Sequence, residues 1–335
     1  MRAVVCVAGG TELAELPDPR PAPDGVVVEV AACGLCGSDV HAVERGHTTE
    51  GQVLGHEFGG TVVEVGRDVD GWRVGQPVAV DPLGSCGSCR ECRRGMPFRC
   101  AALPNLGINA PGGYAEYAAV PAAQLVALPD GVPAEWGAHA EPLAVATRAA
   151  ALAGVGPGDA VLVLGVGTIG LNAVIALKAA GVDLVVGAGR SVTRRRAAAL
   201  AGADVVIDTR EVSLAEHVAA TGRAFDAVLE CSASPGTVTE AMAVLASGGT
   251  CVEVALSGEA AAVPLGPLVG AGLTLTGSCA FARADFTAAV AHVATGDPRV
   301  TGLISERVSL ADVPAALVRL RTPVDLVRVL ALPTT

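Results

Sequence analysis

The amino-acid sequence predicts an α/β protein in which a doubly wound parallel sheet is joined to a β-rich domain. At 335 residues the chain is long for a single hydrophobic core, so two domains are expected. From Val26 to about Val120, short β-rich runs are separated by Gly and Pro clusters, which is typical of antiparallel, barrel-like folds. From about Ala144, buried strands alternate with Ala-rich helical segments, and this alternation builds a parallel sheet covered on both faces.

The β-rich domain is expected to comprise residues 1–143 and 282–335, and the parallel-sheet domain residues 144–281. In the first, strands are predicted at residues 3–7, 26–31, 61–65 and 77–81. In the second, about six strands are predicted, at residues 160–164, 184–187, 205–207, 227–230, 250–254 and 273–277, with helices at residues 171–180 and 194–201. The tail, with short elements at residues 304–310, 313–321 and 326–331, is expected to fold back onto the first domain.

Composition and charge exclude several classes of protein. A chain that is 51% hydrophobic and 17% charged is globular, and a net charge of -11 disfavours nucleic acid and anionic membranes as partners. The apolar stretch at residues 160–189 is interrupted by Asn172, Lys178 and Asp183, so no membrane span is expected. The first residues resemble a strand more than a leader, which favours a cytoplasmic location, where ten cysteines are better explained by metal ligands than by disulfides.

Four cysteines form the most specific metal motif in the chain. They follow the pattern C-x2-C-x2-C-x7-C, and the intervening Gly87 and Gly95 permit the tight turns that four converging thiolates need. An all-sulfur set leaves no open position for a substrate, so a structural zinc is predicted here. An iron-sulfur cluster is the alternative, but the last spacing does not fit the common ferredoxin patterns. The predicted ligands are Cys86, Cys89, Cys92 and Cys100.

A second, mixed set of metal donors lies in the β-rich domain. Cys36 in the segment C-G-S-D-V-H and His56 in G-H-E would supply one sulfur and one imidazole, and Glu57 and Glu141 would supply carboxylates. Such a set suits a catalytic zinc that keeps one position for water or substrate. Taken singly, each of these residues is more often an ordinary core or surface residue.

A dinucleotide-binding loop is predicted where the strand at residues 160–164 leads into a helix. The loop has the pattern G-x-G-x-x-G, in which the glycines allow a tight turn and the helix N-terminus attracts a pyrophosphate, as in a Rossmann domain. An incidental Gly-rich turn is the alternative. The predicted contacts are Gly165, Gly167, Thr168, Ile169 and Gly170.

The segment after the second strand indicates which cofactor binds. An NAD-binding domain would carry an acid about twenty residues after the glycine motif, yet residues 184–203 contain no Asp or Glu. Instead, Gly189 makes room for a 2′-phosphate, and the guanidinium groups of Arg190 and Arg194 can bind it. We therefore predict NADP(H) in preference to NAD(H), and Arg195 and Arg196 are candidates for a solvent-facing role. A basic, solvated helix start in an NAD enzyme remains the alternative.

With these motifs the chain resembles the zinc-containing medium-chain dehydrogenases of the alcohol dehydrogenase superfamily, in the branch of sorbitol and threonine dehydrogenases. The resemblance covers nearly the whole chain and implies a GroES-like catalytic domain beside the Rossmann domain. It implies that Cys36 and His56 bind the catalytic zinc and that Glu57 or Glu141 is a further ligand, without deciding which.

The resemblance also assigns roles to three residues of C-G-S-D-V-H. Asp39 matches the acid that orients the metal-bound imidazole, while Ser38 and His41 match a relay that carries the substrate proton to solvent. A turn serine and a surface histidine are the simpler alternative for the last two.

The predicted function is hydride transfer between NADP(H) and a secondary alcohol or ketone, with a polyol, cyclitol or amino alcohol as substrate, because the segment Glu141-Pro142-Leu143 resembles the polyol and amino-alcohol branch. The alternatives are an NAD-dependent polyol or threonine-type dehydrogenase, an NADPH-dependent reductase of activated double bonds, and a zinc-containing interaction module. Fold analogy favours a homodimer or homotetramer formed through edge strands near residues 273–277.

Overall fold

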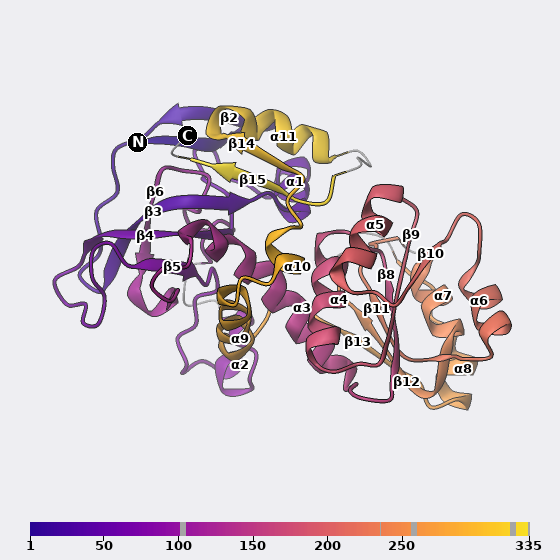
Figure 1. Ribbon diagram of the computed structural model, residues 1–335. Coiled ribbons are helices and arrows are strands. Elements are labelled where there is room, and N and C mark those ends of the chain that lie inside the picture. Colours follow the sequence, from indigo (N-terminus) through magenta and orange to yellow (C-terminus); the bar gives the residue numbers. More distant parts are fainter. Residues whose placement is uncertain (101–104, 235, 256–259, 322–325, 334–335) are drawn as a thin grey trace. The chain divides into compact units, whose positions relative to one another are not determined.

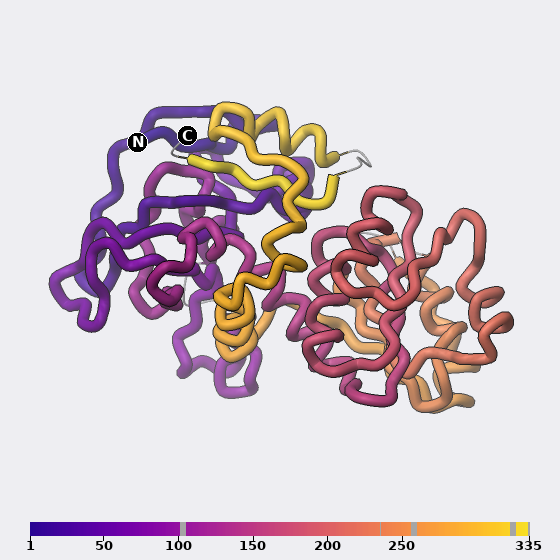
Figure 2. Tube along the Cα trace, in the orientation of Figure 1, coloured from indigo at the N-terminus to yellow at the C-terminus, as the bar shows by residue number. Residues whose placement is uncertain are grey.

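The computed structural model describes residues 1–100, 105–234, 236–255, 260–321 and 326–333. The chain divides into two compact units, which can be followed along the Cα trace (Figure 2). The first consists of Met1–Glu141 with Ala282–Thr335, and the second of Pro142–Phe281. Among the described residues, no helix combines the length and the apolar character that crossing a bilayer requires.

The second unit is built on a six-stranded sheet in which all neighbouring strands are parallel (Figure 1). The strand order β10-β9-β8-β11-β12-β13 places the first two crossovers on one side of β8 and the rest on the other, which is the order of a doubly wound Rossmann sheet. The strands are β8 (Ala160–Leu164), β9 (Leu184–Gly189), β10 (Val205–Asp208), β11 (Phe225–Glu230), β12 (Leu245–Glu253) and β13 (Thr274–Gly277).

Helices cover both faces of this sheet, so that its central strands are buried. Figure 1 shows α4 and α5 on one side and α6, α7 and α8 on the other. All five residues of β8 are buried, which explains why this strand reads as a continuous apolar run. The helices are α3 (Ala140–Ala153), α4 (Thr168–Ala179), α5 (Val192–Ala201), α6 (Leu214–Thr221), α7 (Thr237–Ala243) and α8 (Leu265–Gly270).

The first unit is built on a seven-stranded sheet of order β14-β15-β3-β4-β5-β7, in which β6 also pairs with β3. Its core is filled by Val, Leu and Ala with few rings. The strands are β3 (Gly25–Gly34), β4 (Glu57–Val65), β5 (Pro77–Val80), β6 (Tyr117–Pro121), β7 (Leu125–Ala127), β14 (Glu306–Ser309) and β15 (Val329–Leu332), and a separate hairpin pairs β1 (Arg2–Val7) with β2 (Gly10–Glu15).

The C-terminal residues return to the first unit, as the sequence predicts, because β15 pairs with β3. The strand pairs between residues 26 and 120 are antiparallel, as the sequence predicts, whereas β14 and β15 in the C-terminal residues are parallel. A parallel pair needs a crossover connection, and α11 (Val313–Leu320) provides it. The remaining helices of this unit are α1 (Gly37–Glu44), α2 (Arg90–Arg93), α9 (Arg283–Ala294), α10 (Pro298–Thr301) and the 3-10 turns η1 (Pro97–Arg99), η2 (Ala122–Gln124), η3 (Ala134–His139) and η4 (Leu310–Asp312).

Candidate metal centres and nucleotide-binding edge

Three of the four predicted ligands of the catalytic metal lie together in the first unit. Cys36 caps α1 just after β3, whereas His56 and Glu57 stand at the start of β4. Because β3 and β4 pair in antiparallel register, with Gly34 opposite Glu57, the two segments meet at one end of the sheet. The sulfur, one imidazole nitrogen and one carboxylate oxygen all lie within 4.8 Å of one another.

The electrostatics of this cluster favour a cation. Burial lowers the pKa of His56, but Asp39 and Cys36 outweigh it and hold that pKa well above its usual range. Burial, followed by the charge of Glu57, raises the pKa of the Cys36 thiol. A buried set of one sulfur, one nitrogen and one oxygen donor that stabilises positive charge fits Zn²⁺.

Two buried side chains fix the orientation of the His56 ring. Asp39 Oδ1 lies 3.3 Å from His56 Nδ1. The hydroxyl of Tyr114 donates to Asp39 Oδ2 at 2.6 Å. A carboxylate behind an imidazole sets the tautomer and direction of the ring, and Tyr114 in turn holds the carboxylate. From the sequence, a packing role is the expectation for Tyr114, because its contact with Asp39, 75 positions earlier in the chain, forms only in the folded protein.

We expect Tyr114→Phe to lower the affinity of the catalytic site for zinc about 10-fold, because Asp39 loses the donor that positions it. Zinc content measured during titration with a chelator checks this. Tyr117→Phe is the matched control. Tyr117 lies on β6, and its hydroxyl lies 3.5 Å from Glu29 Oε1 rather than beside Asp39. Equal zinc retention in both variants would show that the Tyr114 hydroxyl does not support the site.

Arg328 forms a buried ion pair with Glu57. Its Nη2 lies 2.8 Å from Glu57 Oε2. The same nitrogen donates to Ala138 O at 2.7 Å. Gly34 is needed beside this pair, because a Cβ at that position would overlap both Glu57 Oε2 and Arg328 Nη2. Sequence reasoning did not single out Arg328, since an arginine near the C-terminus carries no metal-site pattern of its own.

Glu141, the fourth predicted ligand, is buried at the start of α3 but is not part of the three-donor group. Burial raises its pKa to about 8, with His56 opposing the shift and Glu57 adding to it. These influences place Glu141 in the electrostatic neighbourhood of the cluster. The structure thus brings Glu57, rather than Glu141, into direct proximity with Cys36 and His56.

The two residues of the predicted proton relay stand on one side of α1. Ser38 Oγ lies 3.5 Å from His56 Nε2. One helical turn further, the side chain of His41 is 52% exposed and its Nδ1 lies 3.6 Å from Glu44 Oε2. The Ser38 hydroxyl therefore lies next to the buried His56, and the His41 imidazole lies on the exposed side of the same helix.

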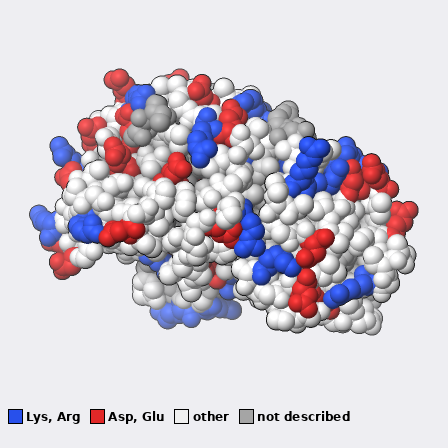
Figure 3. Space-filling view, viewed as in Figure 1, with Lys and Arg blue, Asp and Glu red and all other residues white. Residues whose placement is uncertain are grey.

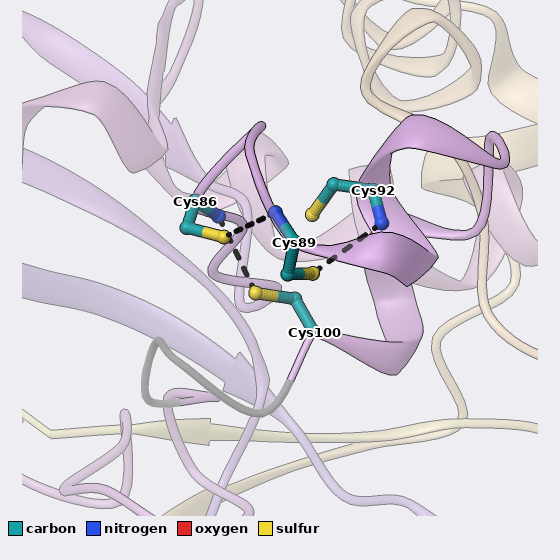
Figure 4. A group of neighbouring side chains, drawn as sticks. All are labelled: Cys86, Cys89, Cys92 and Cys100. Carbon is teal, nitrogen blue, oxygen red and sulfur yellow. Dashed lines mark hydrogen bonds between the residues drawn. The ribbon is translucent and has the colours of Figure 1, made fainter.

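A cysteine knuckle is formed by Cys86, Cys89, Cys92 and Cys100 with the residues between them. Its four sulfurs converge around a common centre (Figure 4). Backbone N–H groups point at the sulfurs: Cys89 N donates to Cys86 Sγ at 3.3 Å, and Cys92 N donates to Cys89 Sγ at 3.4 Å. The hydroxyl and the backbone N–H of Ser88 are the main cause that lowers the pKa of Cys86 to about 6, whereas burial and the neighbouring cysteines raise that of Cys92 to about 11. Such N–H···S contacts stabilise thiolates, so the residues fit a closed tetrathiolate zinc site.

Exposed arginines surround this knuckle. They belong to α2, η1 and the turn between them, and blue atoms gather over this lobe at the bottom of the space-filling view (Figure 3). A zinc ion bound by four thiolates carries a net negative charge, which neighbouring guanidinium groups offset. The arginines are Arg90, Arg93, Arg94 and Arg99.

The predicted dinucleotide loop connects β8 to α4 in the second unit. Gly165 has φ +95°, and a Cβ there would lie 2.7 Å from the backbone of Cys231 and Ser232. A Cβ on Gly170 would overlap Gly165 O, whereas a Cβ on Gly167, the N-cap of α4, would meet no atom closer than Arg194 Nη1 at 4.0 Å. Thr168 and Ile169 form the first turn of α4. The loop therefore places three glycines, which have no side chains, at the N-terminus of α4, where a phosphate is attracted.

The basic segment that should select the cofactor follows β9. Gly189 ends the strand, Arg190 is exposed, and Arg194 lies in the first turn of α5 with its Nη1 4.0 Å from the Cβ position of Gly167. A solvent-facing role for Arg195 is wrong. Its Nη2 lies 2.7 Å from Asp208 Oδ2, and its side chain is 17% exposed.

Comparison with known proteins identifies both units. Residues 22–130 match the family described as alcohol dehydrogenase GroES-like domain, and residues 168–295 match zinc-binding dehydrogenase. A scyllo-inosose 3-dehydrogenase from Thermotoga maritima is 34% identical over 94% of this chain and 88% of its own. These matches confirm the predicted fold class, a Rossmann domain with a GroES-like domain.

Two solved structures share the fold over 99% of both chains, each with a TM-score of 0.92. A putative zinc-binding dehydrogenase from Sinorhizobium meliloti 1021, bound to NADP, is 33% identical. A short chain alcohol dehydrogenase (RspB) from E. coli CFT073, complexed with NADH, is 30% identical. The chain therefore belongs to the zinc-containing medium-chain dehydrogenases of the alcohol dehydrogenase superfamily.

Proposed function

We propose that this enzyme transfers hydride between NADP(H) and a secondary alcohol or ketone of a polar substrate, such as a polyol, a cyclitol or an amino alcohol. The observation that carries the proposal is the buried group of Cys36, His56 and Glu57, which offers a zinc ion three unlike donors. Zinc in such a site supplies Lewis acidity to the substrate oxygen, which eases release of hydride from the attached carbon.

The side chains around this site have three further tasks: metal binding, orientation of the imidazole and proton transfer. Cys36 and His56 bind the metal, and Asp39 keeps the imidazole in one orientation. During oxidation the substrate hydroxyl must lose a proton, and Ser38 stands where it can take that proton up and pass it to His41 on the exposed side of α1.

We further propose that Glu57 is the third protein ligand and that Glu141 acts as a nearby carboxyl group that can hold a proton. The proximity of Glu57 to Cys36 and His56, and the raised pKa of Glu141, support this division. Zinc analysis of Glu57→Gln and Glu141→Gln tests it: the former is expected to lose zinc more readily. If Glu141→Gln lost zinc more readily than Glu57→Gln, Glu141 would be the ligand instead.

A preference for NADP(H) is supported by Gly189, Arg190 and Arg194 beside the glycine loop, and by the absence of an acid in residues 184–203. The similar protein from S. meliloti was solved with NADP, while the one from E. coli was solved with NADH. The latter is the observation that keeps an NAD-dependent enzyme as the second candidate.

We expect Arg190→Ala combined with Arg194→Ala to raise the KM for NADP⁺ about 10- to 100-fold and to leave that for NAD⁺ nearly unchanged, because a 2′-phosphate loses charge-assisted hydrogen bonds of about 1.5–3 kcal/mol. Initial rates with both cofactors measure this. Arg196→Ala, an exposed position of the same helix, is the control. Unchanged KM values for NADP⁺ in the double variant would contradict the preference.

The substrate class is supported by the polyol-like segment Glu141-Pro142-Leu143 and by the similarity to the T. maritima scyllo-inosose 3-dehydrogenase. A panel of sugar alcohols, cyclitols, amino alcohols and simple alcohols, assayed with both cofactors, tests it. The highest kcat/KM is expected for a polar secondary alcohol. Activity confined to activated double bonds, and surviving loss of the catalytic zinc, would refute alcohol chemistry.

We also propose a homodimer or homotetramer formed through β13, which stands at one end of the six-stranded sheet and pairs on one side only among the described residues. Size-exclusion chromatography with light scattering tests this, and a monomer at assay concentration would refute it. A cytoplasmic location is supported by the ten cysteines, none of which forms a disulfide in the described part of the chain, a state that a reducing compartment preserves.

A further inference from the structure

Two carboxylates meet at the carboxyl end of the Rossmann sheet, away from the metal ligands. Glu230 ends β11, Glu253 ends β12, and the two are partners in the parallel register. Glu230 is completely buried. In both residues Oε2 is shielded from solvent and has no hydrogen-bond partner among the described residues. Two buried, facing carboxyl oxygens are stable together only when a proton lies between them.

Neighbouring hydrogen-bond donors distinguish the two members of the pair. Glu230 Oε1 receives the Ser232 N–H at 2.9 Å, the Thr237 hydroxyl at 2.8 Å and the Ser232 hydroxyl. Three donors directed at one oxygen hold the Glu230 side chain in the role of hydrogen-bond acceptor. Glu253 is therefore the member that carries the proton.

The charges nearby agree with this assignment. Burial, followed by the hydrogen bond and the charge of Glu230, raises the pKa of Glu253 to about 8. The other titratable groups facing the pair are the thiols of Cys231 and Cys251, whose pKa values burial also raises, so they stay neutral. In the described part of the chain no Lys, Arg or His pairs with either carboxylate. At neutral pH Glu253 thus keeps its proton.

The pair lies beside the dinucleotide loop. Residues 231 and 232, which follow Glu230, are the backbone that Gly165 approaches closely. In a doubly wound sheet the ligand crosses the carboxyl ends of the strands at the switch point, here between β8 and β11. The glycine loop and the basic segment occupy the β8–β9 half. The second mononucleotide, which carries the nicotinamide, then falls on the half formed by β11 and β12.

We propose that Glu230 and Glu253 form a one-proton pair that distinguishes the oxidised from the reduced cofactor. The inference rests on the proposed nicotinamide-dependent function. The oxidised ring carries a positive charge, which favours two carboxylates: the Glu253 O–H bond breaks and its proton goes to solvent. The reduced ring is neutral, so Glu253 keeps its proton. No electrons move in this step.

The sign of the pH dependence follows from linkage. Because binding of the oxidised cofactor releases a proton, its affinity must rise with pH until Glu253 is already ionised in the free enzyme, near pH 8. The reduced cofactor lacks this contribution. The preference for the oxidised form should therefore increase up to about 10-fold per pH unit below pH 8.

Isothermal titration calorimetry of the zinc-loaded enzyme tests this. NADP⁺ and NADPH are titrated near pH 7 in buffers of different ionisation enthalpy, which gives the protons released on binding. We expect NADP⁺ to release up to about one proton more than NADPH. The 2′-phosphate is common to both ligands, so its protonation cancels in this difference.

Glu253→Gln isolates the pair, because an amide can donate to Glu230 but cannot release a proton. We expect the NADP⁺–NADPH difference to fall by up to about one proton in this variant and to be unchanged in Glu240→Gln, an exposed acid on α7. Groups at the metal site contribute equally to all three proteins. A proton difference that is the same in wild type and Glu253→Gln would overturn the inference, whereas failure of either nucleotide to bind would instead refute the proposed function.

Discussion

Replacing Cys36 with serine is expected to lower kcat/KM for alcohol oxidation about 1,000-fold or more. Cys36 contributes the only sulfur to the donor group with His56 and Glu57, and without it the group cannot retain zinc at the substrate oxygen. The Lewis acidity of a bound metal contributes several kcal/mol to the transition state, and 1.36 kcal/mol corresponds to a tenfold change in rate. Initial-rate kinetics with a responsive alcohol from the panel measure the effect.

The matched control is Cys279→Ser, which makes the same chemical change at an exposed thiol. Its kinetics should equal those of wild type, and its zinc content should be unchanged. If Cys36→Ser retained both its zinc and more than about a tenth of wild-type kcat/KM, Cys36 could not be a ligand of a catalytic metal.

Replacing Cys89 with serine is expected to release the knuckle zinc and to lower Tm by roughly 10 °C. Structural zinc contributes directly to folding free energy, and a loss of a few kcal/mol corresponds to a shift of this size in a domain of 150–250 residues. Cys89 N and Sγ both take part in the N–H···S contacts of the knuckle, so its loss disturbs two neighbours at once. Differential scanning calorimetry with zinc analysis measures both quantities.

The Cys89→Ser variant should lose stability, whereas the Cys36→Ser variant should lose activity. Because the knuckle ligand set is closed, kcat per remaining zinc should stay near the wild-type value at temperatures where the protein is folded. A folded Cys89→Ser protein with normal Tm would contradict a structural role. Loss of kcat without loss of Tm would assign the knuckle to catalysis.

Much of the fold and of the site could be predicted because the signals are local in sequence. The apolar run at residues 160–164, the glycines after it and the Ala-rich helix form one continuous strand-loop-helix segment. The cysteine knuckle spans only residues 86–100. In both cases the spacing itself carries the chemistry, so no long-range contact had to be known.

The roles that sequence reasoning missed depend on tertiary contacts. Arg328 reaches Glu57 only because β15 pairs with β3. Tyr114 reaches Asp39 from a distant loop, and Glu253 meets Glu230 through the register of two strands that are separated by α7. The ion pair of Arg195 could not be predicted for the same reason, since its partner Asp208 lies on the next strand of the sheet. None of these pairs leaves a spacing pattern in the chain.

The central claim is that a zinc ion bound through Cys36 and His56 carries the chemistry, beside a separate structural zinc. Elemental analysis of purified, chelator-free protein tests it most directly, with the Cys36→Ser protein measured in parallel. The account predicts two equivalents of zinc per chain in the wild type and one in the variant. A wild-type protein that is fully active with a single equivalent, or a variant that keeps both, would contradict it.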